Sequence, residues 1–188
     1  KDVLLLLLTS FIEDLSANDL KRPYLLVVDE GERLFQTELA RQFVITCYRT
    51  WRKYNSAIWC LSQNYKDFLA DKNLADSLLP NTTHLLILRQ RKIDWEDFKK
   101  TFDFNDAQVS AIKSLRIKKG EYSEMYYMQD ENQTILMLIP EPLSYWICTS
   151  DGNDKTKILE THSKYPELSQ MEVLQKIAFG DKFKREHL

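Results

Sequence analysis

The chain is poor in the residues that build disulfide frameworks and metal sites. Among its 188 residues there are only three cysteines and three histidines. Cys47, Cys60 and Cys148 are far apart, and each lies among apolar neighbours, so we expect reduced core thiols in a cytosolic protein. A zinc site would need closely spaced ligand pairs, and the histidines have no companion at such a spacing. The sequence therefore argues against both disulfides and a zinc centre.

Long hydrophobic runs and a strong net charge are also missing. The most apolar stretch, Val3 to Leu8 with Phe11 and Ile12 following, is interrupted by polar residues and falls short of the roughly 20 residues that span a bilayer. We expect a buried helix there, and no signal peptide, because a basic leader and a cleavage site are lacking. A formal net charge of −2 argues against a protein that works mainly by coating nucleic acid, although it leaves room for a local basic patch.

One apolar run ends abruptly on two acids. Tyr24 to Val28 is followed directly by Asp29 and Glu30. Such a run suits a strand buried on both faces of a parallel sheet, and ligands bind just beyond the carboxyl ends of such strands. In phosphoryl-transfer sites, a carboxylate at this place helps hold magnesium and a neighbouring group orients the attacking water. The structural alternative is that the acids merely end the strand and cap the next helix.

A helix and a second strand follow the acids. Residues 37–54 have helical periodicity with one broad apolar face, and 57–61 is an apolar run that ends on Ser62 and Gln63. A strand, helix, strand unit makes its two strands parallel, so both strand ends should face one crevice, within about 10 Å of each other. Gln63 could then donate to a phosphate oxygen or position a water without adding charge. The alternative is a surface glutamine that begins a loop.

The second half of the chain changes character. Residues 84–88 are expected to form a third buried strand, and helices are expected at 95–101 and 105–115. Short strands in an antiparallel meander are predicted at 121–128, 134–139 and 143–149. The tail from Asp151 is polar and then helical, with Gly180 as a stop before a charged end. The predicted fold class is α/β, with parallel core strands followed by antiparallel strands and a C-terminal helical tail.

Three of these features together resemble the RecA-like motor ATPases of conjugative transfer and type IV secretion. They are the acidic strand end, the helix finishing in Tyr48-Arg49-Thr50-Trp51-Arg52-Lys53-Tyr54, and the strand leading to Ser62-Gln63. The group most similar is TraC-like, equivalent to the fourth VirB protein, and the resemblance runs from the first helix to about Thr149. It implies that residues 1–150 are the C-terminal part of a RecA-like P-loop ATPase domain and that 151–188 form a helical tail.

The resemblance also implies site residues. Asp29 and Glu30 match the Walker B acids, with Asp29 as the magnesium ligand and Glu30 as a catalytic acid, and both would contact the nucleotide. Gln63 matches the sensor glutamine, which is implied to be catalytic and nucleotide-binding. Arg49, Arg52 and Lys53 match the basic segment before the sensor strand. Arg49 or Arg52 is a candidate arginine finger for a neighbouring subunit, and the Arg89 and Arg91 pair is the alternative.

Cofactors, partners and location follow from the same resemblance. The implied cofactors are ATP and Mg²⁺. The implied partners are other subunits in a hexamer and the proteins of a secretion or conjugation machinery. The implied location is cytoplasmic, at the inner face of the bacterial inner membrane, with membrane association only through partners. Nucleic acid is a less favoured partner: the basic helix face with its aromatic residues could track a backbone, but the rest of the chain is mildly acidic.

The sequence departs from the family pattern at the phosphate loop. The chain contains no G-x-x-x-x-G-K-[ST] segment, and none of its four glycines, Gly31, Gly120, Gly152 and Gly180, begins such a loop. We therefore expect the chain to be the later part of a motor domain. Without the amides and lysine that hold the β- and γ-phosphates, it should bind ATP weakly or not at all and hydrolyse none.

Two other functions are compatible with the residues. One is a non-catalytic α/β docking module whose late strands and tail bind secretion partners, with the acids serving only the structure. The other is a metal-dependent nuclease that uses Asp29 and Glu30. The nuclease is the weaker of the two, because it would need more acids at the site, and the other strand ends offer amide and basic groups instead.

Overall fold

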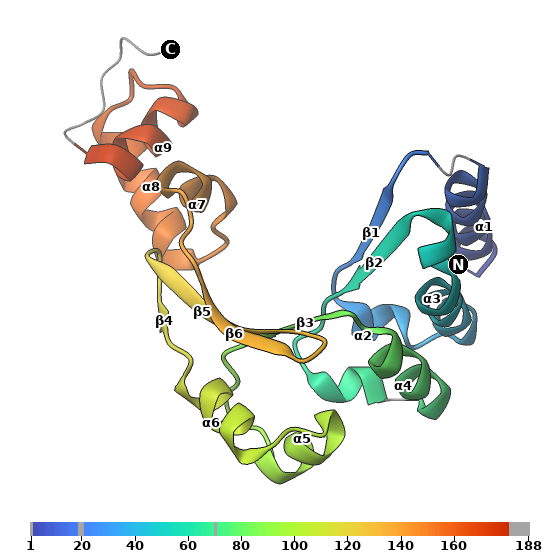
Figure 1. The fold of residues 1–188 in the computed structure, drawn as a ribbon. Coiled ribbons are helices and arrows are strands. Elements are labelled where there is room, and N and C mark those ends of the chain that lie inside the picture. Colours follow the sequence, from blue (N-terminus) through green and yellow to red (C-terminus); the bar gives the residue numbers. More distant parts are fainter. Residues whose placement is uncertain (1, 19–20, 70, 181–188) are drawn as a thin grey trace. The chain divides into compact units, whose positions relative to one another are not determined.

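The computed structural model describes residues 2–18, 21–69 and 71–180. The chain divides into two compact units (Figure 1). The first is formed by the residues up to 85 together with 93–105, and the second by 86–92 together with the residues from 106 onward. The charged end after Gly180, predicted from the sequence, lies outside the described residues.

The first unit is built around one parallel strand pair. Its elements are α1 (Asp2–Asn18), β1 (Tyr24–Val28), α2 (Gly31–Leu34), α3 (Glu38–Thr50), the 3-10 turn η1 (Trp51–Tyr54), β2 (Ser56–Cys60), η2 (Tyr65–Leu69), α4 (Lys72–Leu78), η3 (Leu79–Asn81) and α5 (Trp95–Phe102). β1 and β2 are parallel, in register from Tyr24 opposite Ser56 to Val28 opposite Cys60. The predicted strand, helix, strand unit is confirmed.

The core of this unit lies along the apolar face of α3. Ala40 and Val44 are completely buried, and α3 packs with α4 and one face of the strands. The same cluster holds Phe35, Phe43, Ile45, Cys47, Trp51, Leu74 and Leu78. Thr37 caps the start of α3 by accepting from the Ala40 amide, as its sequence position favours. The helical periodicity therefore predicted the buried face of α3 correctly.

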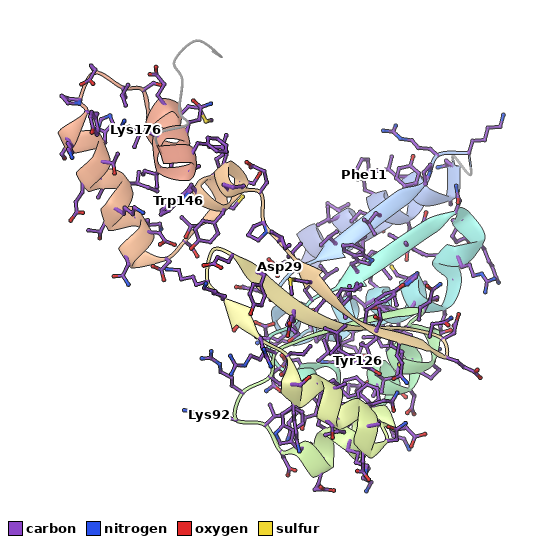
Figure 2. All side chains as sticks on the ribbon, turned by 60° about the vertical axis from the view of Figure 1, so that its left-hand side comes forward. Phe11, Asp29, Lys92, Tyr126, Trp146 and Lys176 are labelled. Atoms are coloured by element: carbon purple, nitrogen blue, oxygen red, sulfur yellow. The ribbon has the colours of Figure 1, made fainter. Side chains whose placement is uncertain are left out.

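The expected burial of both strand faces is wrong for the described chain. Side chains alternate along a strand, and one face of the pair carries Leu25, Val27 and Trp59, which are 51 to 55% exposed. The reason is that the helices packed on the strands, α1 and α3, lie on one side of the pair (Figure 1). The first helix is likewise not fully buried: Phe11 (labelled in Figure 2) is 59% exposed. The side chains of residues 2–6 lie outside the described part of the chain.

The second unit combines an antiparallel sheet with helices. Its elements are α6 (Asp106–Ser114), β4 (Ile117–Lys118), β5 (Tyr122–Gln129), β6 (Asn132–Leu138), α7 (Pro142–Cys148), α8 (Gly152–Lys164) and α9 (Gln170–Phe179), and β3 (His84–Leu88) joins its sheet. β5 is central, between β6 on one side and β3 and β4 on the other. The β5–β6 hairpin is antiparallel and turns at Asp130 in the left-handed region, with Gln129 opposite Asn132. The two predicted strands of the hairpin are confirmed.

Three sequence predictions fail in this part of the chain. β3 pairs with β5 rather than extending the parallel pair, and Leu86 and Leu88 are about half exposed, so it is not a fully buried strand. Residues 143–149 are not a strand, because Pro142 at the first helical position and the Glu141 carboxylate, which accepts from two backbone amides, begin α7. The resulting surface helix leaves Cys148 exposed, not in the core.

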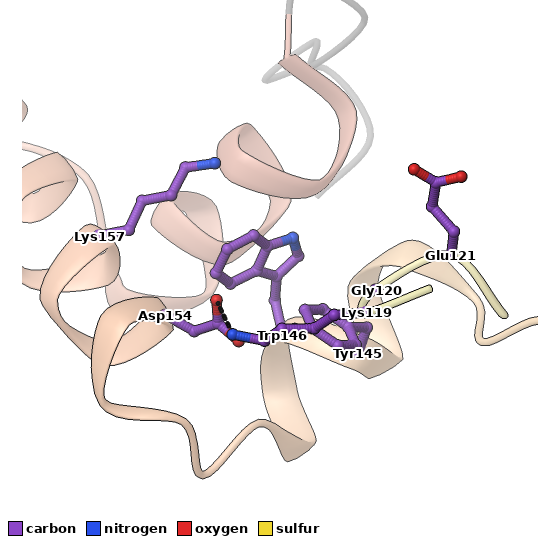
Figure 3. Close-up of a pocket in the computed structure, with 7 residues that line it drawn as sticks. All are labelled: Lys119, Gly120, Glu121, Tyr145, Trp146, Asp154 and Lys157. Atoms are coloured by element: carbon purple, nitrogen blue, oxygen red, sulfur yellow. Dashed lines mark hydrogen bonds and ion pairs between the residues drawn. The ribbon is translucent and has the colours of Figure 1, made fainter. Parts of the chain in front are cut away.

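The turn between β4 and β5 is fixed onto the helices of the same unit. Lys119 Nζ lies 2.8 Å from Asp151 and 3.2 Å from Asp154, and the Tyr145 hydroxyl donates to Asp154 at 2.6 Å. Gly120, with φ of 75°, lays the turn against the Tyr145 ring. A shallow hollow of about 280 Å³ remains here (Figure 3), lined by Lys119, Gly120, Glu121, Tyr145, Trp146, Asp154 and Lys157. The two acids that line the hollow already hold lysines, Asp154 with Lys119 and Glu121 with Lys118, so these contacts are structural.

Among the described residues, no helix combines the length and apolar character that a bilayer crossing requires.

Candidate functional site

The carboxyl ends of β1 and β2 form one continuous hydrogen-bonded edge. Beyond the last strand pair, Leu61 N donates to Val28 O at 2.9 Å, and Gly31 N donates to Leu61 O at 2.9 Å. Parallel pairing therefore continues into the two loops. The structure brings the Asp29–Glu30 segment and the Ser62–Gln63 segment onto adjacent loops at one end of the pair, as the strand, helix, strand unit predicted.

Gly31 permits the close approach of these two loops. It is buried, and a Cβ placed on it would lie 3.1 Å from the Phe35 ring and 3.3 Å from Leu61 O. A side chain would therefore press on the carbonyl that accepts the Gly31 amide. The lack of a side chain here, rather than unusual backbone freedom, keeps the acid loop hydrogen-bonded to the glutamine loop.

The two acids are held in a strained but ordered turn. Glu30 has φ of 52° and ψ of 51°, in the left-handed region, and its amide donates to Asp29 Oδ1 at 2.9 Å. A residue other than glycine or asparagine in this region costs on the order of 1 kcal/mol. Asp29 (labelled in Figure 2) is exposed, and its second carboxylate oxygen has no hydrogen-bond partner in the described chain. Strain of this kind concentrates at functional sites.

The glutamine loop is ordered by side chains that the sequence reading missed. The Ser62 hydroxyl donates to Asp67 and accepts from Asn64 N at 3.2 Å, while Asp67 N donates to Asn64 O at 3.1 Å. Gln63, between these anchored residues, is exposed, and its amide has no hydrogen-bond partner among the described residues. The Ser-x-Asn spacing after an apolar strand is typical of side-chain-capped turns and could have revealed this loop.

A third acid lies close in sequence to the predicted pair. Glu32, in the first turn of α2, has a buried Oε2 atom without a hydrogen-bond partner in the part of the chain that the structure describes. Nothing in the apolar-run pattern singled it out, because an acid in the first turn of a helix is common.

The two candidate arginines lie at the other end of the strand pair. Since α3 returns the chain from the end of β1 to the start of β2, Arg49 and Arg52 are remote from Asp29 within one chain. Arg49 Nη2 donates to Ser77 Oγ at 2.7 Å, which ties α3 to α4. Arg52 is exposed and has no partner among the described residues. A role for either at a triphosphate therefore requires a second subunit.

The donor set at the strand ends fits a magnesium site only if a phosphate completes it. The described residues contain no group of three His, Cys, Asp or Glu side chains that could hold a metal. Magnesium is commonly bound by one or two carboxylates together with substrate phosphates and water. The exposed Asp29 carboxylate, with one oxygen still unpaired, suits the protein's share of such a site.

Comparison with known proteins defines the class of this chain. The TraG P-loop domain family matches residues 2–178, and the chain belongs to that family. It is similar to Protein TraC of Escherichia coli (strain K12), with 29% identity over 135 residues, covering 68% of this chain and 15% of TraC. It is also similar to the solved structure of VirB4 of Thermoanaerobacter pseudethanolicus, with a TM-score of 0.58, 26% identity, and 72% of this chain and 36% of that chain covered.

These matches confirm the resemblance to the TraC and VirB4 group and the predicted α/β fold class. The described elements share the fold of VirB4 over most of this chain. The chain spans 15% of the length of TraC and 36% of the VirB4 chain, so the two relatives extend well beyond the region they share with it.

Proposed function

We propose that this chain is the later part of a motor ATPase that couples ATP hydrolysis to conjugative transfer or type IV secretion. The observation that carries the proposal is the hydrogen-bonded edge at the ends of β1 and β2, which holds an acid pair and a glutamine on adjacent loops. In a chain of the TraG P-loop domain family, ligands are expected at the carboxyl ends of the parallel strands.

Each residue of this edge has a role that follows from its environment. Asp29 would hold Mg²⁺ through its unpaired carboxylate oxygen, and the ion when bound would neutralise charge on the phosphates. Glu30 would orient the attacking water and accept its proton. The exposed Gln63 amide would donate to a γ-phosphate oxygen or hold the same water.

The assembly that we propose is a hexamer at the cytoplasmic, inner face of a bacterial inner membrane. A neighbouring subunit would supply the arginine that stabilises transition-state charge. Arg52 is the better candidate, because the Arg49 guanidinium is already bonded to Ser77. In this assembly residues 1–150 belong to the motor domain and 151–188 form its helical tail. Contact with the membrane is made through proteins of the secretion or conjugation machinery.

The 188 residues alone should not hydrolyse ATP. They contain no phosphate loop, so no lysine or glycine-rich backbone is present to hold the β- and γ-phosphates. We expect no magnesium-dependent phosphate release by the purified chain above a no-protein control. Robust turnover by a pure sample would contradict the assignment of this chain as the later part of a motor domain.

The decisive experiment is Glu30→Gln in the polypeptide that carries this chain together with a phosphate loop. We expect ATP turnover to fall by on the order of 100-fold or more, with nucleotide binding retained, because an amide cannot accept the proton of the attacking water. Glu160→Gln, an exposed acid on α8, is the matched control and should leave turnover unchanged. Unaltered turnover in Glu30→Gln would overturn the catalytic role.

The docking module remains the second candidate because of one observation. Every residue of β6 is exposed, including Leu136, Met137 and Leu138, as a surface that meets a partner strand would be. Retained binding of secretion proteins by a variant without ATP turnover would favour this function.

A further inference from the structure

We propose that Asp67 is a positioning residue, which aims the Gln63 amide by fixing the Ser62 hydroxyl. The inference rests on the proposed function of Gln63 and extends it to a side chain that no sequence motif assigned. Asp67 does not itself need to reach the nucleotide. It acts through the loop that carries the glutamine.

The hydrogen bonds of the loop place Gln63 between two fixed points. On one side the Ser62 hydroxyl is held by the Asp67 carboxylate. On the other side Asn64 N donates to Ser62 Oγ at 3.2 Å, and Asn64 O accepts from Asp67 N at 3.1 Å. The residues that flank Gln63 in sequence are thus both tied to Asp67, while the Gln63 side chain is free to meet a ligand.

The start of η2 reinforces the same loop. Asn64 Oδ1 accepts from Lys66 N at 3.0 Å, so the residue after the glutamine also caps the turn that contains Asp67. Leu61, just before Ser62, is hydrogen-bonded to β1 and to Gly31 through its amide and carbonyl. The chain is therefore held by hydrogen bonds on both sides of Gln63, and the Ser62 side chain links the end of β2 to Asp67.

The Ser62–Asp67 bond is the contact whose loss should matter most. A hydroxyl bonded to a carboxylate is held about twice as strongly as one bonded to a neutral group. Without the carboxylate, the hydroxyl can turn toward Asn64 O, 3.2 Å away, and it no longer ties β2 to η2. A displacement of about 1 Å in a positioned group can cost on the order of 100-fold in rate.

The test is a double-mutant cycle between Asp67 and Gln63, in the polypeptide that carries this chain and a phosphate loop. We expect Asp67→Ala to lower kcat by on the order of tenfold or more, with KM for ATP within about twofold. Combined with Gln63→Ala, the Asp67→Ala change should lower kcat no further than Gln63→Ala alone. Asp67→Asn should restore part of the loss, because its amide oxygen still accepts from Ser62.

Two controls separate positioning from folding. Asp71→Asn alters the cap of α4, where Asp71 Oδ1 accepts from Leu74 N, and it should leave kcat unchanged. The Tm of each variant, read by circular dichroism, shows whether the loss of rate tracks a loss of structure. Multiplicative losses of kcat in the double variant, or a rate that follows Tm across all variants, would overturn the role of Asp67.

Measuring Glu30→Gln beside the Asp67–Gln63 cycle distinguishes a failure of the Asp67 role from a failure of the proposed function. If Glu30→Gln abolishes turnover and the Asp67–Gln63 cycle is multiplicative, the site is catalytic and Asp67 does not act through the glutamine. If Glu30→Gln and Gln63→Ala both leave turnover unchanged, the proposed function itself is wrong.

Discussion

At the scale of single residues, the acid pair shows a conflict between stability and the chemistry we propose. Glu30 occupies a left-handed backbone conformation that asparagine or glycine would adopt with less strain. The strain is retained beside Asp29, at the end of a parallel strand. Positions that keep an ill-suited residue in a strained turn are often those where the side chain is needed.

We expect Glu30→Asn to stabilise the 188-residue chain while it removes the proposed catalytic acid. The free energy of unfolding should rise by up to about 1 kcal/mol, because asparagine tolerates the left-handed region. Urea denaturation followed by circular dichroism measures it. Asp29→Asn, which keeps the acceptor for the Glu30 amide and changes no backbone strain, is the control and should shift stability less. A clear loss of stability in Glu30→Asn would contradict this account of the turn.

The half-buried Cys60 thiol and the buried Tyr65 phenol predict a lower free energy of unfolding at alkaline pH. Burial raises the pKa of the Cys60 thiol to about 11, and burial with the hydrogen bond to Asp97 raises the pKa of Tyr65 to about 12. A group with a pKa raised on folding stabilises the native state below its unfolded pKa and loses that contribution as the pH rises. The unfolded values are 9.0 for cysteine and 10.0 for tyrosine, so the loss should begin near pH 9.

The measurement is the urea midpoint of the chain at pH 8 and at about pH 10.5. We expect a lower midpoint at the higher pH. Cys60→Ser removes one of the raised groups and should make the difference between the two midpoints smaller. Equal midpoints at both pH values would show that these groups do not ionise on unfolding as their burial implies.

The sequence predicted the position of a single residue only where the direction of the strands determines it. Asp29 and Gln63 were brought to adjacent loops because a strand, helix, strand unit makes its strands parallel. Asp67, Asn64 and Glu32 were missed, because their positions depend on short turns after the strands and not on any apolar period. The roles of Arg49 and Arg52 stay predictions, because both lie at the opposite end of the strand pair from Asp29.

At the scale of elements, the pattern of apolar residues predicted where most helices and strands lie, but not which strands pair with each other. The strands β1 (24–28) and β3 (84–88) lie where the apolar runs are. However, β3 pairs with β5 and not with β2. An apolar run indicates a strand without indicating which edge it joins. The strand predicted at 143–149 is α7, because the Glu141 cap and Pro142 outweigh the β-forming aromatic and branched residues that follow.

The strand β6 is an exposed edge without the usual protection against self-association. Its seven residues carry no charge and no proline, and its outer side has no strand partner among the described elements. We expect Leu138→Lys to raise the solubility of the chain without lowering its Tm, because this side chain is 57% exposed. Dynamic light scattering at increasing concentration measures the effect. Tyr126→Lys, at a 2% exposed position of β5, is the contrasting variant and should unfold the unit. A fall of Tm in Leu138→Lys would show that β6 is covered.

At the scale of the whole molecule, each unit buries apolar side chains of its own. The first has the cluster around Val44 of α3, and the second has buried side chains that include Val173 of α9, both valines being completely buried. The boundary predicted at residue 150, between the motor domain and the helical tail, stays a prediction. Chain crossings between units, as at residues 86–92, cannot be read from composition, because no linker-like stretch marks them.

Separate sets of buried side chains in the two units predict two separable unfolding transitions. Val44→Ala and Val173→Ala should each cost about 2 kcal/mol through lost burial and the cavity left behind. In differential scanning calorimetry, we expect the first substitution to lower one transition and the second to lower the other. If both substitutions lower the same single transition, the two units unfold together as one cooperative structure.

The bond from the Gly31 amide to the Leu61 carbonyl couples the two loops mechanically. Because the bond joins main-chain atoms, a displacement of the Asp29–Glu30 loop is transmitted to the Gln63 loop without the help of a side chain. A substitution that shifts either loop should therefore alter the position of the other, even where their side chains do not meet.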